Sequence, residues 1–418
     1  MRITAKLLDS VVAATTEMLT FAQPADGVLS VFFHVHRTGT WERGLIAETA
    51  YSVLRHKRLL ERLTAGGDVR RMVLAALVRF QGLSQRQLAE ASTAEESTWL
   101  ATIKGRAEPE LSLAERVDFP DWLAERLAAR LSEHELIELA KGLNQPAPLD
   151  LRVNSLKANR EQVLAQLAAD NIEAVPCRYA PLGIRLKGKP SLARHPLYLD
   201  GKIEVQDEGS QLLGYLLAPK RGEMVVDFCA GAGGKTLLLG ALMRSSGRLY
   251  AFDVAEKRLA KLRPRVARAG LSNVHPICIS GENDIRIKRL AGKIDRVLVD
   301  APCSGLGTLR RNPDLKWRQT PESVAELTRK QADILASASR LVKSGGRLVY
   351  ATCSILPEEN EMVINAFLAA HPDFVRLSAV ELLAKQEIAV DTGADLRLLP
   401  HLHATDGFFA VAMERLRP

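Results

Sequence analysis

The sequence predicts a helical N-terminal domain at residues 1–140, a small α+β module at 145–204 and an α/β domain at 205–418. Helical periodicity with few internal glycines runs through the first part. Pro146 and Pro148 then mark a linker. Towards the C-terminus, apolar strands alternate with helical segments, a pattern typical of a mostly parallel sheet with helices on both faces.

The composition is that of a soluble globular protein. Of the 418 residues, 47% are hydrophobic and 25% are charged, and no apolar run approaches the roughly 18 residues that a membrane helix needs. The first residues are too evenly charged for a signal peptide, so we expect a cytoplasmic protein without membrane contact. The five cysteines include no C-x-x-C pair, which predicts free thiols and no metal site. A monomer is the default expectation. The formal charge of +8 permits a nucleic-acid partner without establishing one.

The helical domain contains two apolar stripes, one from Leu7 to Val12 and another from Ile46 to Leu63. The second stripe also carries a basic cluster that includes Arg55 and Arg58. Such a cluster is either a solvated helix face or a phosphate-binding face, and by itself it favours neither.

Short alternating strands and one helix make up the predicted small module: strands at 149–154, 175–179 and 183–186, and a helix near 160–170. A module of roughly 60 residues is near the lower size limit for an independent domain.

The predicted α/β domain consists of alternating strands and helices. We expect strands at 224–228, 248–252, 274–279, 296–299 and 347–351. We expect helices at 210–217, 236–243, 256–269 and 321–342. A final apolar stretch at 407–413 is expected to return antiparallel at the sheet edge.

A glycine-rich loop follows the first strand of this domain. Asp227 ends the strand, and the candidate cofactor-binding residues that follow are Cys229, Ala230, Gly231, Ala232, Gly233, Gly234 and Lys235. Glycines there let the backbone approach a ligand closely. Asp253 ends the second strand, where a carboxylate can accept hydrogen bonds from ribose hydroxyls.

The spacing within this loop favours S-adenosylmethionine over other nucleoside cofactors. Residue 236 is Thr, which breaks the G-x-G-x-x-G pattern of nicotinamide sites. Residue 229 is Cys, which breaks the G-x-x-x-x-G-K-[ST] pattern of phosphate loops.

Two cysteines, Cys303 and Cys353, follow the fourth and fifth strands of the domain. Because parallel strands deliver their carboxyl ends to one crevice, we expect both thiols to face the cofactor. A thiolate that adds to C6 of cytosine makes C5 reactive toward a methyl sulfonium, and a second thiol can help the elimination step. Asp300, just before this loop, can hydrogen-bond the base and stabilise the adduct.

Several motifs resemble the Nop/Sun (Fmu/RsmB) family of RNA cytosine-C5 methyltransferases. The matching stretches are 205–211, 227–236, 300–305, 310–314 and Thr352-Cys353-Ser354. The resemblance covers about residues 145 to 418 and implies a Rossmann-like catalytic domain preceded by an RNA-recognition-like module. The N-terminal helices resemble, more weakly, the NusB-like domain of the bacterial 16S rRNA members, which implies 16S rRNA as the substrate.

This resemblance also implies roles for individual residues. Cys353 is the implied nucleophile, and Cys303 assists product release. Residues 229–235 and Asp253 bind S-adenosylmethionine, and Asp300 lies between cofactor and base. Glu282 is the expected adenine contact, although the family usually has an aspartate in a Gly-Asp pair there.

We further expect basic residues to contact RNA phosphates, namely Arg55, Arg58, Arg310, Arg311 and Lys316. The target cytosine must be unpaired or leave its stack to reach a thiol in the crevice. The alternatives left open are a catalytically silent RNA-binding assembly factor, or a methyltransferase acting on tRNA or on DNA cytosine. In the DNA enzymes the cysteine of the Pro-Cys loop is the nucleophile, so Cys303 would attack.

Overall fold

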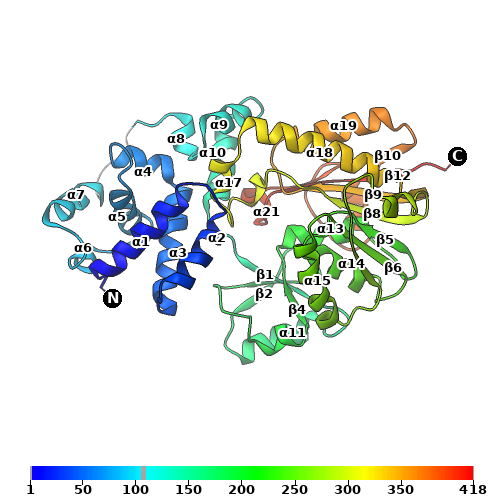
Figure 1. Ribbon diagram of the computed structural model, residues 1–418, viewed down its shortest axis with the longest axis horizontal. Coiled ribbons are helices and arrows are strands. Elements are labelled where there is room, and N and C mark those ends of the chain that lie inside the picture. Colours follow the sequence, from blue (N-terminus) through cyan, green and yellow to red (C-terminus); the bar gives the residue numbers. More distant parts are fainter. Residues whose placement is uncertain (1, 105–109, 418) are drawn as a thin grey trace. The chain divides into compact units, whose positions relative to one another are not determined.

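The computed structural model describes residues 2–104 and 110–417 and divides the chain into two compact units. The helical unit consists of Met1–Gln145 and Thr308–Pro321, and the α/β unit consists of Pro146–Gly307 and Glu322–Pro418 (Figure 1). Among the described helices, none is long and apolar enough to cross a membrane. The predicted fold class is confirmed, with helices first and an α/β sheet after them.

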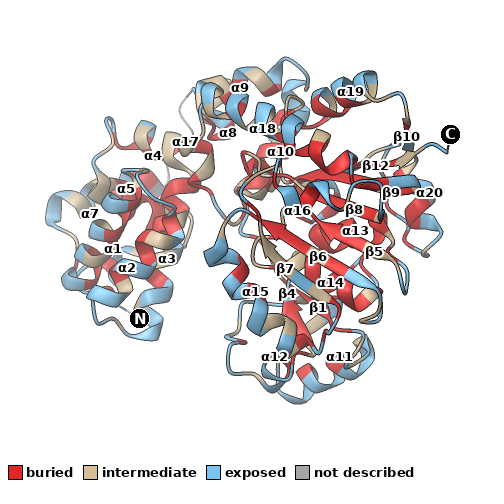
Figure 2. Cartoon of the chain, turned by 45° about the vertical axis from the view of Figure 1, so that its right-hand side comes forward, coloured by how far each residue is buried: buried red, intermediate tan, exposed pale blue. Residues whose placement is uncertain are grey.

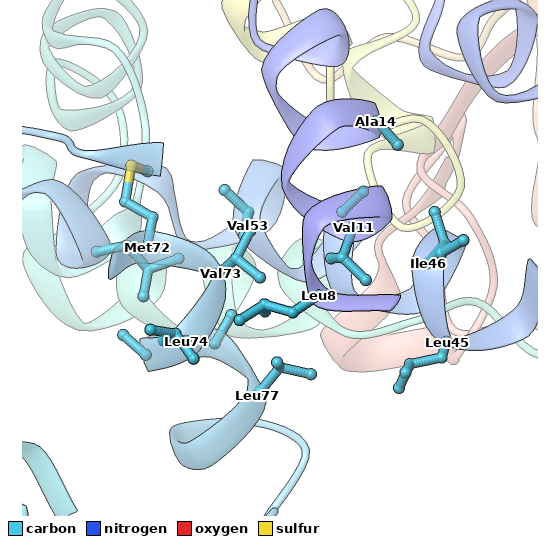
Figure 3. Close-up of a cluster of buried hydrophobic side chains, with 14 of the residues drawn as sticks. Leu8, Val11, Ala14, Leu45, Ile46, Val53, Met72, Val73, Leu74 and Leu77 are labelled. Carbon is cyan, nitrogen blue, oxygen red and sulfur yellow. The ribbon is translucent and has the colours of Figure 1, made fainter. Parts of the chain in front are cut away.

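The helical unit is built from amphipathic helices, of which α1 to α7 surround one core. They are α1 (Ala5–Met18), α2 (Ala25–Val35), α3 (Thr40–Arg55), α4 (Lys57–Leu63), α5 (Val69–Arg79), α6 (Gln85–Leu88), α7 (Ala94–Lys104), α8 (Leu113–Val117), α9 (Asp121–Ala128) and α10 (Glu133–Asn144). Leu8 and Val11 of α1, Ile46 and Val53 of α3, and Leu77 of α5 converge in this core (Figure 3). Its apolar burial is the main force that stabilises the unit.

A segment from the catalytic half of the sequence also belongs to the helical unit. Residues 308–321 directly follow the Pro-Cys loop and contain α17 (Leu315–Arg318). Trp317 Nε1 donates a hydrogen bond to the Leu54 carbonyl over 2.8 Å. The backbone N–H of Ala25 donates to Asp314 over 3.3 Å. The sequence did not predict that residues 308–321 fold with the helical unit, because the residues on either side of this segment belong to the α/β domain.

The small module is a four-stranded antiparallel sheet in the order β2-β3-β1-β4. Its strands are β1 (Leu149–Val153), β2 (Ala174–Pro176), β3 (Gly183–Leu186) and β4 (Ile203–Val205). Helix α11 (Arg160–Ala169) packs Val163 and Leu167 against this sheet, and α12 (Pro196–Leu199) adds Leu197. The module and the α/β domain belong to the same compact unit.

Asp150 and Cys177 of the module and Glu208, which follows the module in sequence, are buried, and their possible ligand atoms lie within 4.8 Å of one another. Arg185 lies between the acids, with Nε and Nη2 donating to Asp150 over 2.7 and 2.9 Å and a 3.4 Å contact to Glu208. This arrangement is that of a buried ion-pair network, because the arginine already supplies the balancing charge.

The large sheet runs β10-β12-β9-β8-β5-β6-β7, and β11 pairs with β12. Its strands are β5 (Met224–Asp227), β6 (Arg248–Asp253), β7 (Val274–Cys278), β8 (Ile294–Asp300), β9 (Val342–Thr352), β10 (Phe374–Leu377), β11 (Leu396–Leu398) and β12 (Phe408–Arg415). Strands β5 to β9 are parallel, and β12 is antiparallel to β9. The prediction that β12 lies at the edge was wrong, because β10 and β11 cover its far side.

Helices cover both faces of this sheet, whose strands form the buried red layer of Figure 2. The first face packs on α13 (Glu208–Leu217), α14 (Gly234–Leu242), α15 (Glu256–Ala269) and α20 (Ala379–Ala384). The second packs on α16 (Ile285–Lys288), α18 (Pro321–Ser339) and α19 (Glu361–Ala370). Successive residues alternate between the two cores, as Val349 and Tyr350 do. This double burial explains the continuous apolar runs that identified the strands.

Candidate active site

A cavity of about 370 Å³ opens at the carboxyl ends of β5, β6, β8 and β9. Its wall consists of Phe228, Cys229, Ala230, Gly231, Ala232, Asp253, Val254, Arg258, Ile279, Glu282, Asp300, Ala301, Pro302, Cys303, Lys330, Ile334 and Cys353. Ligands of open α/β sheets bind at this edge, because the βα loops converge there.

The glycine loop takes backbone conformations that side chains disfavour. Gly231 has φ +56° and Gly233 has φ +88°, both in the left-handed region. A Cβ on Gly233 would lie 2.1 Å from Leu262 Cδ1, so the loop packs closely on α15. Space around the Gly231 Cβ position is open instead, which leaves the backbone accessible to a ligand in the cavity.

Asp253 holds the glycine loop to the second strand. Its Oδ2 accepts a 2.8 Å hydrogen bond from the Gly231 N–H, and its Oδ1 accepts one of 2.7 Å from the Ala255 N–H. Arg258 Nη2 lies 3.2 Å from Oδ1. A carboxylate has several acceptor lone pairs, so Asp253 retains capacity to accept from a ligand hydroxyl.

Asp227 has a structural place behind the loop. It is buried and is absent from the cavity wall, and the Thr236 hydroxyl donates to it over 2.7 Å. Burial raises the pKa of Asp227 to about 7. The contact ties the first turn of α14 to the end of β5.

Lys235 and Asp300 form an ion pair beside the cavity, with Nζ and Oδ2 2.7 Å apart. Burial by itself lowers the pKa of Lys235, but the neighbouring Asp300 carboxylate outweighs it, and the pKa is raised above its ordinary value. Lys235 therefore carries a charge that fixes the Asp300 side chain on the cavity wall.

The thiols of Cys303 and Cys353 lie on the cavity wall with their sulfur atoms 3.3 Å apart. The hydrogen bond with Cys353, then burial, then the charges of Cys353 and Glu359 raise the pKa of Cys303 well above its ordinary value. Cys303 is therefore a protonated thiol at neutral pH that can donate to the Cys353 sulfur.

Backbone contacts lock the two cysteine loops together. The Gly307 N–H donates to the Cys353 carbonyl over 2.8 Å, and the Gly407 N–H donates to the Gly307 carbonyl over 2.8 Å. A Cβ on Gly307 would lie 2.2 Å from the Gly407 carbonyl oxygen, so only glycine permits this crossing.

The glycine loop is also held by a side chain of the small module and by one that binds the module. Arg152 of β1 donates to the Gly234 carbonyl over 2.8 Å. Arg265 of α15 donates to the Ala232 carbonyl over 2.6 Å and also binds Glu204 of β4 over 2.9 Å. Sequence reasoning missed this support, because a resemblance to an RNA-recognition-like module points to RNA and not to the cofactor loop.

Comparison with known proteins agrees with this geometry. The family model of the 16S rRNA methyltransferase RsmB/F matches residues 214–414, and the ferredoxin-like domain model of RsmF/B-like methyltransferases matches residues 119–193. A probable ribosomal RNA small subunit methyltransferase B from Synechocystis sp. is 39% identical over 73% of this chain and 68% of its own length. The chain belongs to the RsmB/F family.

The chain is also similar to another RsmB/F relative and to solved structures. A probable ribosomal RNA small subunit methyltransferase B from Bacillus subtilis is 34% identical over 74% of this chain and 69% of its own length. The crystal structure of PH0851 is 29% identical, with a TM-score of 0.82 over 99% of this chain and 100% of that one. A methyltransferase homolog protein from Pyrococcus horikoshii is 31% identical, with a TM-score of 0.62 over 73% of this chain and 98% of that one.

Most of the predicted cofactor residues line the cavity, among them Cys229, Asp253, Glu282 and Asp300. Gly233, Gly234 and Lys235 of the same loop lie outside the wall, because they begin α14 or pair with Asp300. Burial and nearby carboxylates raise the pKa of Cys229 far above its ordinary value, which makes it an unreactive thiol.

Glu282 and Asp284 separate in their roles. Glu282 lies on the cavity wall. Asp284 caps α16, where it accepts from the backbone of Arg286 and Ser280 over 2.8 Å each. The adenine contact of Glu282 therefore stays a prediction, with Glu282 on the cavity wall.

The predicted RNA contacts of the helical unit need correction. Arg55, Arg310 and Lys316 are 8%, 7% and 0% exposed. Lys316 Nζ donates to the Arg55 carbonyl over 2.8 Å and to Asn144 Oδ1 over 3.0 Å, and Arg55 donates to the Arg310 carbonyl over 3.0 Å. Side chains that are buried and bonded in this way are not available to phosphates.

The remaining predicted contacts are partly buried. Arg58 donates to the Phe119 carbonyl over 3.1 Å and to Asp121 over 2.6 Å, and Arg311 is half-buried. The exposed cations that border the cavity are Arg258 and Lys330 instead, and neither was predicted. A signal for Arg258 was present in the dense basic run that includes Lys257, Lys261 and Arg263.

Proposed function

We propose that this chain methylates C5 of a cytosine in 16S rRNA with S-adenosylmethionine as the methyl donor. The observation that carries the proposal is the pair of thiols, 3.3 Å apart, on the wall of a cavity that the glycine loop also lines. Two free thiols at contact distance fit a reaction in which one adds to the base and the other helps it leave.

The residues of the cavity fit S-adenosylmethionine. The open backbone at Gly231 leaves room for a ligand, Asp253 can accept from ribose hydroxyls, and Glu282 can accept from the adenine amino group. When bound, this cofactor supplies an electrophilic methyl group.

Cys353 is the proposed nucleophile. Its thiolate adds to C6 of the cytosine, which raises the electron density at C5. Cys303, which remains a thiol because its pKa is raised, donates its hydrogen to the Cys353 sulfur. This hydrogen bond stabilises the thiolate before attack and again as the leaving group.

Asp300 is the proposed contact to the cytosine ring. Its ion pair with Lys235 holds the carboxylate beside Cys303 and Cys353. A fixed hydrogen-bonding group next to the ring stabilises the adduct, because no reorganisation is needed during the reaction.

The RNA substrate follows from the family names and from charge near the cavity. Arg258 and Lys330 border the cavity, and Lys257, Lys261 and Arg263 extend the exposed basic surface along α15. Phosphates flanking a flipped cytosine would contact these side chains. We place the enzyme in the cytoplasm, where its ribosomal substrate is assembled, and propose that it acts as a monomer.

The proposal is tested by incubating the protein with labelled S-adenosylmethionine and unmodified 16S rRNA, followed by nucleoside mass spectrometry. The expected product is 5-methylcytidine at one position. Another methylated nucleoside would overturn the cytosine-C5 assignment. Transfer to tRNA or DNA with 16S rRNA left unmodified would overturn the substrate assignment. Cofactor binding without transfer to any of these would favour a silent assembly factor.

A further inference from the structure

Glu359 lies behind the two cysteine loops with its side chain fully buried, at 0% exposure. Its carboxylate accepts 2.8 Å and 2.5 Å hydrogen bonds from the backbone N–H and hydroxyl of Ser304. It also accepts from the Ser354 hydroxyl and, over 3.0 Å, from Gln331 Nε2. These donors are uncharged, and a buried carboxylate needs such a set of hydrogen bonds, because removing the charge from water is costly.

Apart from Gln331, the donors come from the residue that follows each of the two thiols. Ser304 follows Cys303 at the end of β8, and Ser354 follows Cys353 at the end of β9. The two serine hydroxyls lie 3.2 Å apart on the same carboxylate. The Glu359 side chain therefore connects the loop of Cys303 with the loop of Cys353.

The position of Glu359 is itself fixed by neighbouring bonds. Tyr350 Oη donates to the Glu359 carbonyl over 2.6 Å. Asn360 accepts from the Thr352 hydroxyl over 2.5 Å and donates to the Ser354 carbonyl over 3.0 Å. These bonds connect β9 to the start of α19, so the carboxylate cannot shift without moving the loop of Cys353.

We propose that Glu359 is a positioning residue that holds Cys303 and Cys353 at contact distance and thereby enables release of the methylated base from Cys353. This inference rests on the proposed two-thiol reaction. It extends that proposal to a residue outside the cavity wall.

The release step shows why the distance matters. Water accepts the C5 proton, the electrons of that C–H bond form the C5–C6 double bond, and the electrons of the C6–S bond return to Cys353. The departing sulfur is stabilised by the hydrogen of the Cys303 thiol, 3.3 Å away. The negative charge of Glu359 also contributes to the raised pKa of Cys303, after its hydrogen bond to Cys353 and burial.

The test compares wild type with Glu359→Gln and with Glu326→Gln, a matched change at an exposed position of α18. An amide accepts through one oxygen only, so it cannot bind both serines and Gln331 as the carboxylate does. We expect Glu359→Gln to lower kcat by about 10²-fold, the usual effect of misplacing a reacting group by about 1 Å. KM for RNA and cofactor Kd should change less than about threefold, and the covalent protein–RNA adduct should accumulate.

A second readout uses the protein without RNA. The alkylation rates of Cys303 and Cys353 by iodoacetamide are followed against pH by peptide mass spectrometry. Glu359→Gln is expected to lower the apparent pKa of Cys303, and Glu326→Gln should leave it unchanged. If thiol reactivity and kcat of Glu359→Gln both match wild type, the positioning role is wrong.

A third variant covers the case in which Glu359→Gln does not fold. The double variant Ser304→Ala, Ser354→Ala removes the two hydroxyl hydrogen bonds to Glu359. The carboxylate keeps its hydrogen bonds from Gln331 and from the backbone N–H of residue 304. We expect kcat to fall about tenfold with more adduct, and unchanged kcat and adduct would contradict the proposal. The two proposals can also fail separately. If Glu359→Gln alters the pH dependence of Cys303 alkylation but the wild-type protein methylates no RNA, the positioning role stands and the proposed function is wrong.

Discussion

The α/β unit and the helical unit both bury ionisable side chains, but the surroundings of these groups differ. Cys303 and Cys353 meet on a cavity wall, with Asp300 and Lys235 beside them. Lys316 is enclosed by the helical unit, where carbonyl and amide oxygens accept from it. The two thiols face a cavity that a substrate can fill. The hydrogen bonds of Lys316, in contrast, go to oxygen atoms of the helical unit itself.

This difference separates burial on a cavity wall from burial inside a packed unit. Parallel strands deliver the carboxyl ends of β8 and β9 to one edge, so loops remote in sequence share a cavity. In the helical unit, the buried Lys316 side chain links α17 to the end of α3 and to α10 instead. Charge alone did not distinguish the two situations, but position at a strand end did.

Removing the proposed nucleophile should have the largest effect. We expect Cys353→Ala to lower methyl transfer more than about 10⁴-fold, the scale seen when a catalytic nucleophile is lost. Cofactor affinity, measured by calorimetry, should remain within about threefold of wild type, because the glycine loop and Asp253 are unchanged. Residual transfer within tenfold of wild type would contradict the assignment.

Breaking the ion pair beside the thiols should have the next largest effect. Asp300→Asn removes the charge that pairs with Lys235, and we expect kcat to fall about 10²- to 10³-fold. Single-turnover kinetics with saturating cofactor measure this directly. As a comparison, Asp295→Asn at the opposite end of β8 should keep kcat near the wild-type value, and equal losses in both variants would indicate a general folding defect.

Lys316 should affect stability and its pH dependence instead of catalysis. Burial lowers the pKa of Lys316 to about 7, below its unfolded value of about 10.4. Between these values the unfolded state binds more protons, so the free energy of unfolding should rise with pH across this window. Lys316→Met should flatten that rise in urea titrations between pH 7 and 10 and leave kcat within about threefold of wild type. If the free energy of unfolding of Lys316→Met rises with pH as steeply as that of wild type, groups other than Lys316 cause the pH dependence.

Exposed cations should give the smallest effect. We expect Lys261→Ala on α15 to reduce the slope of log affinity against log salt by about 1, because one phosphate contact is lost. Arg310→Ala should lower stability and leave the slope unchanged, because Arg310 is buried. Filter binding of 16S rRNA at several salt concentrations measures both. The opposite pattern would restore the helical unit as the phosphate-binding surface.

The sequence predicted those features that depend on local patterns. The apolar runs located β5 to β9, and the rule that parallel strands end at one edge placed Cys303 beside Cys353. Features set by long-range packing were not predictable. The short strands β10 and β11 have weak patterns, so β12 was wrongly placed at the edge. Residues 308–321 adjoin the Pro-Cys loop in sequence but fold with the helical unit.

Glu359 illustrates the same limit within the site. It is one of several acidic residues near 358–361, and no local pattern indicates which of them is buried. Its role depends on two serines, one of which lies 55 residues away in sequence. The serines could have been noticed from the repeated Cys-Ser pairs, but not their common partner.

The central claim is that the two thiols have different roles in one reaction. The most direct test is to incubate Cys303→Ala with S-adenosylmethionine and 16S rRNA, and to identify the cross-linked peptide by mass spectrometry after a denaturing gel. We predict a stable adduct between a methylated cytosine and Cys353, which is absent from Cys353→Ala. An adduct of Cys353→Ala through Cys303, with none in Cys303→Ala, would reverse the roles and contradict the account.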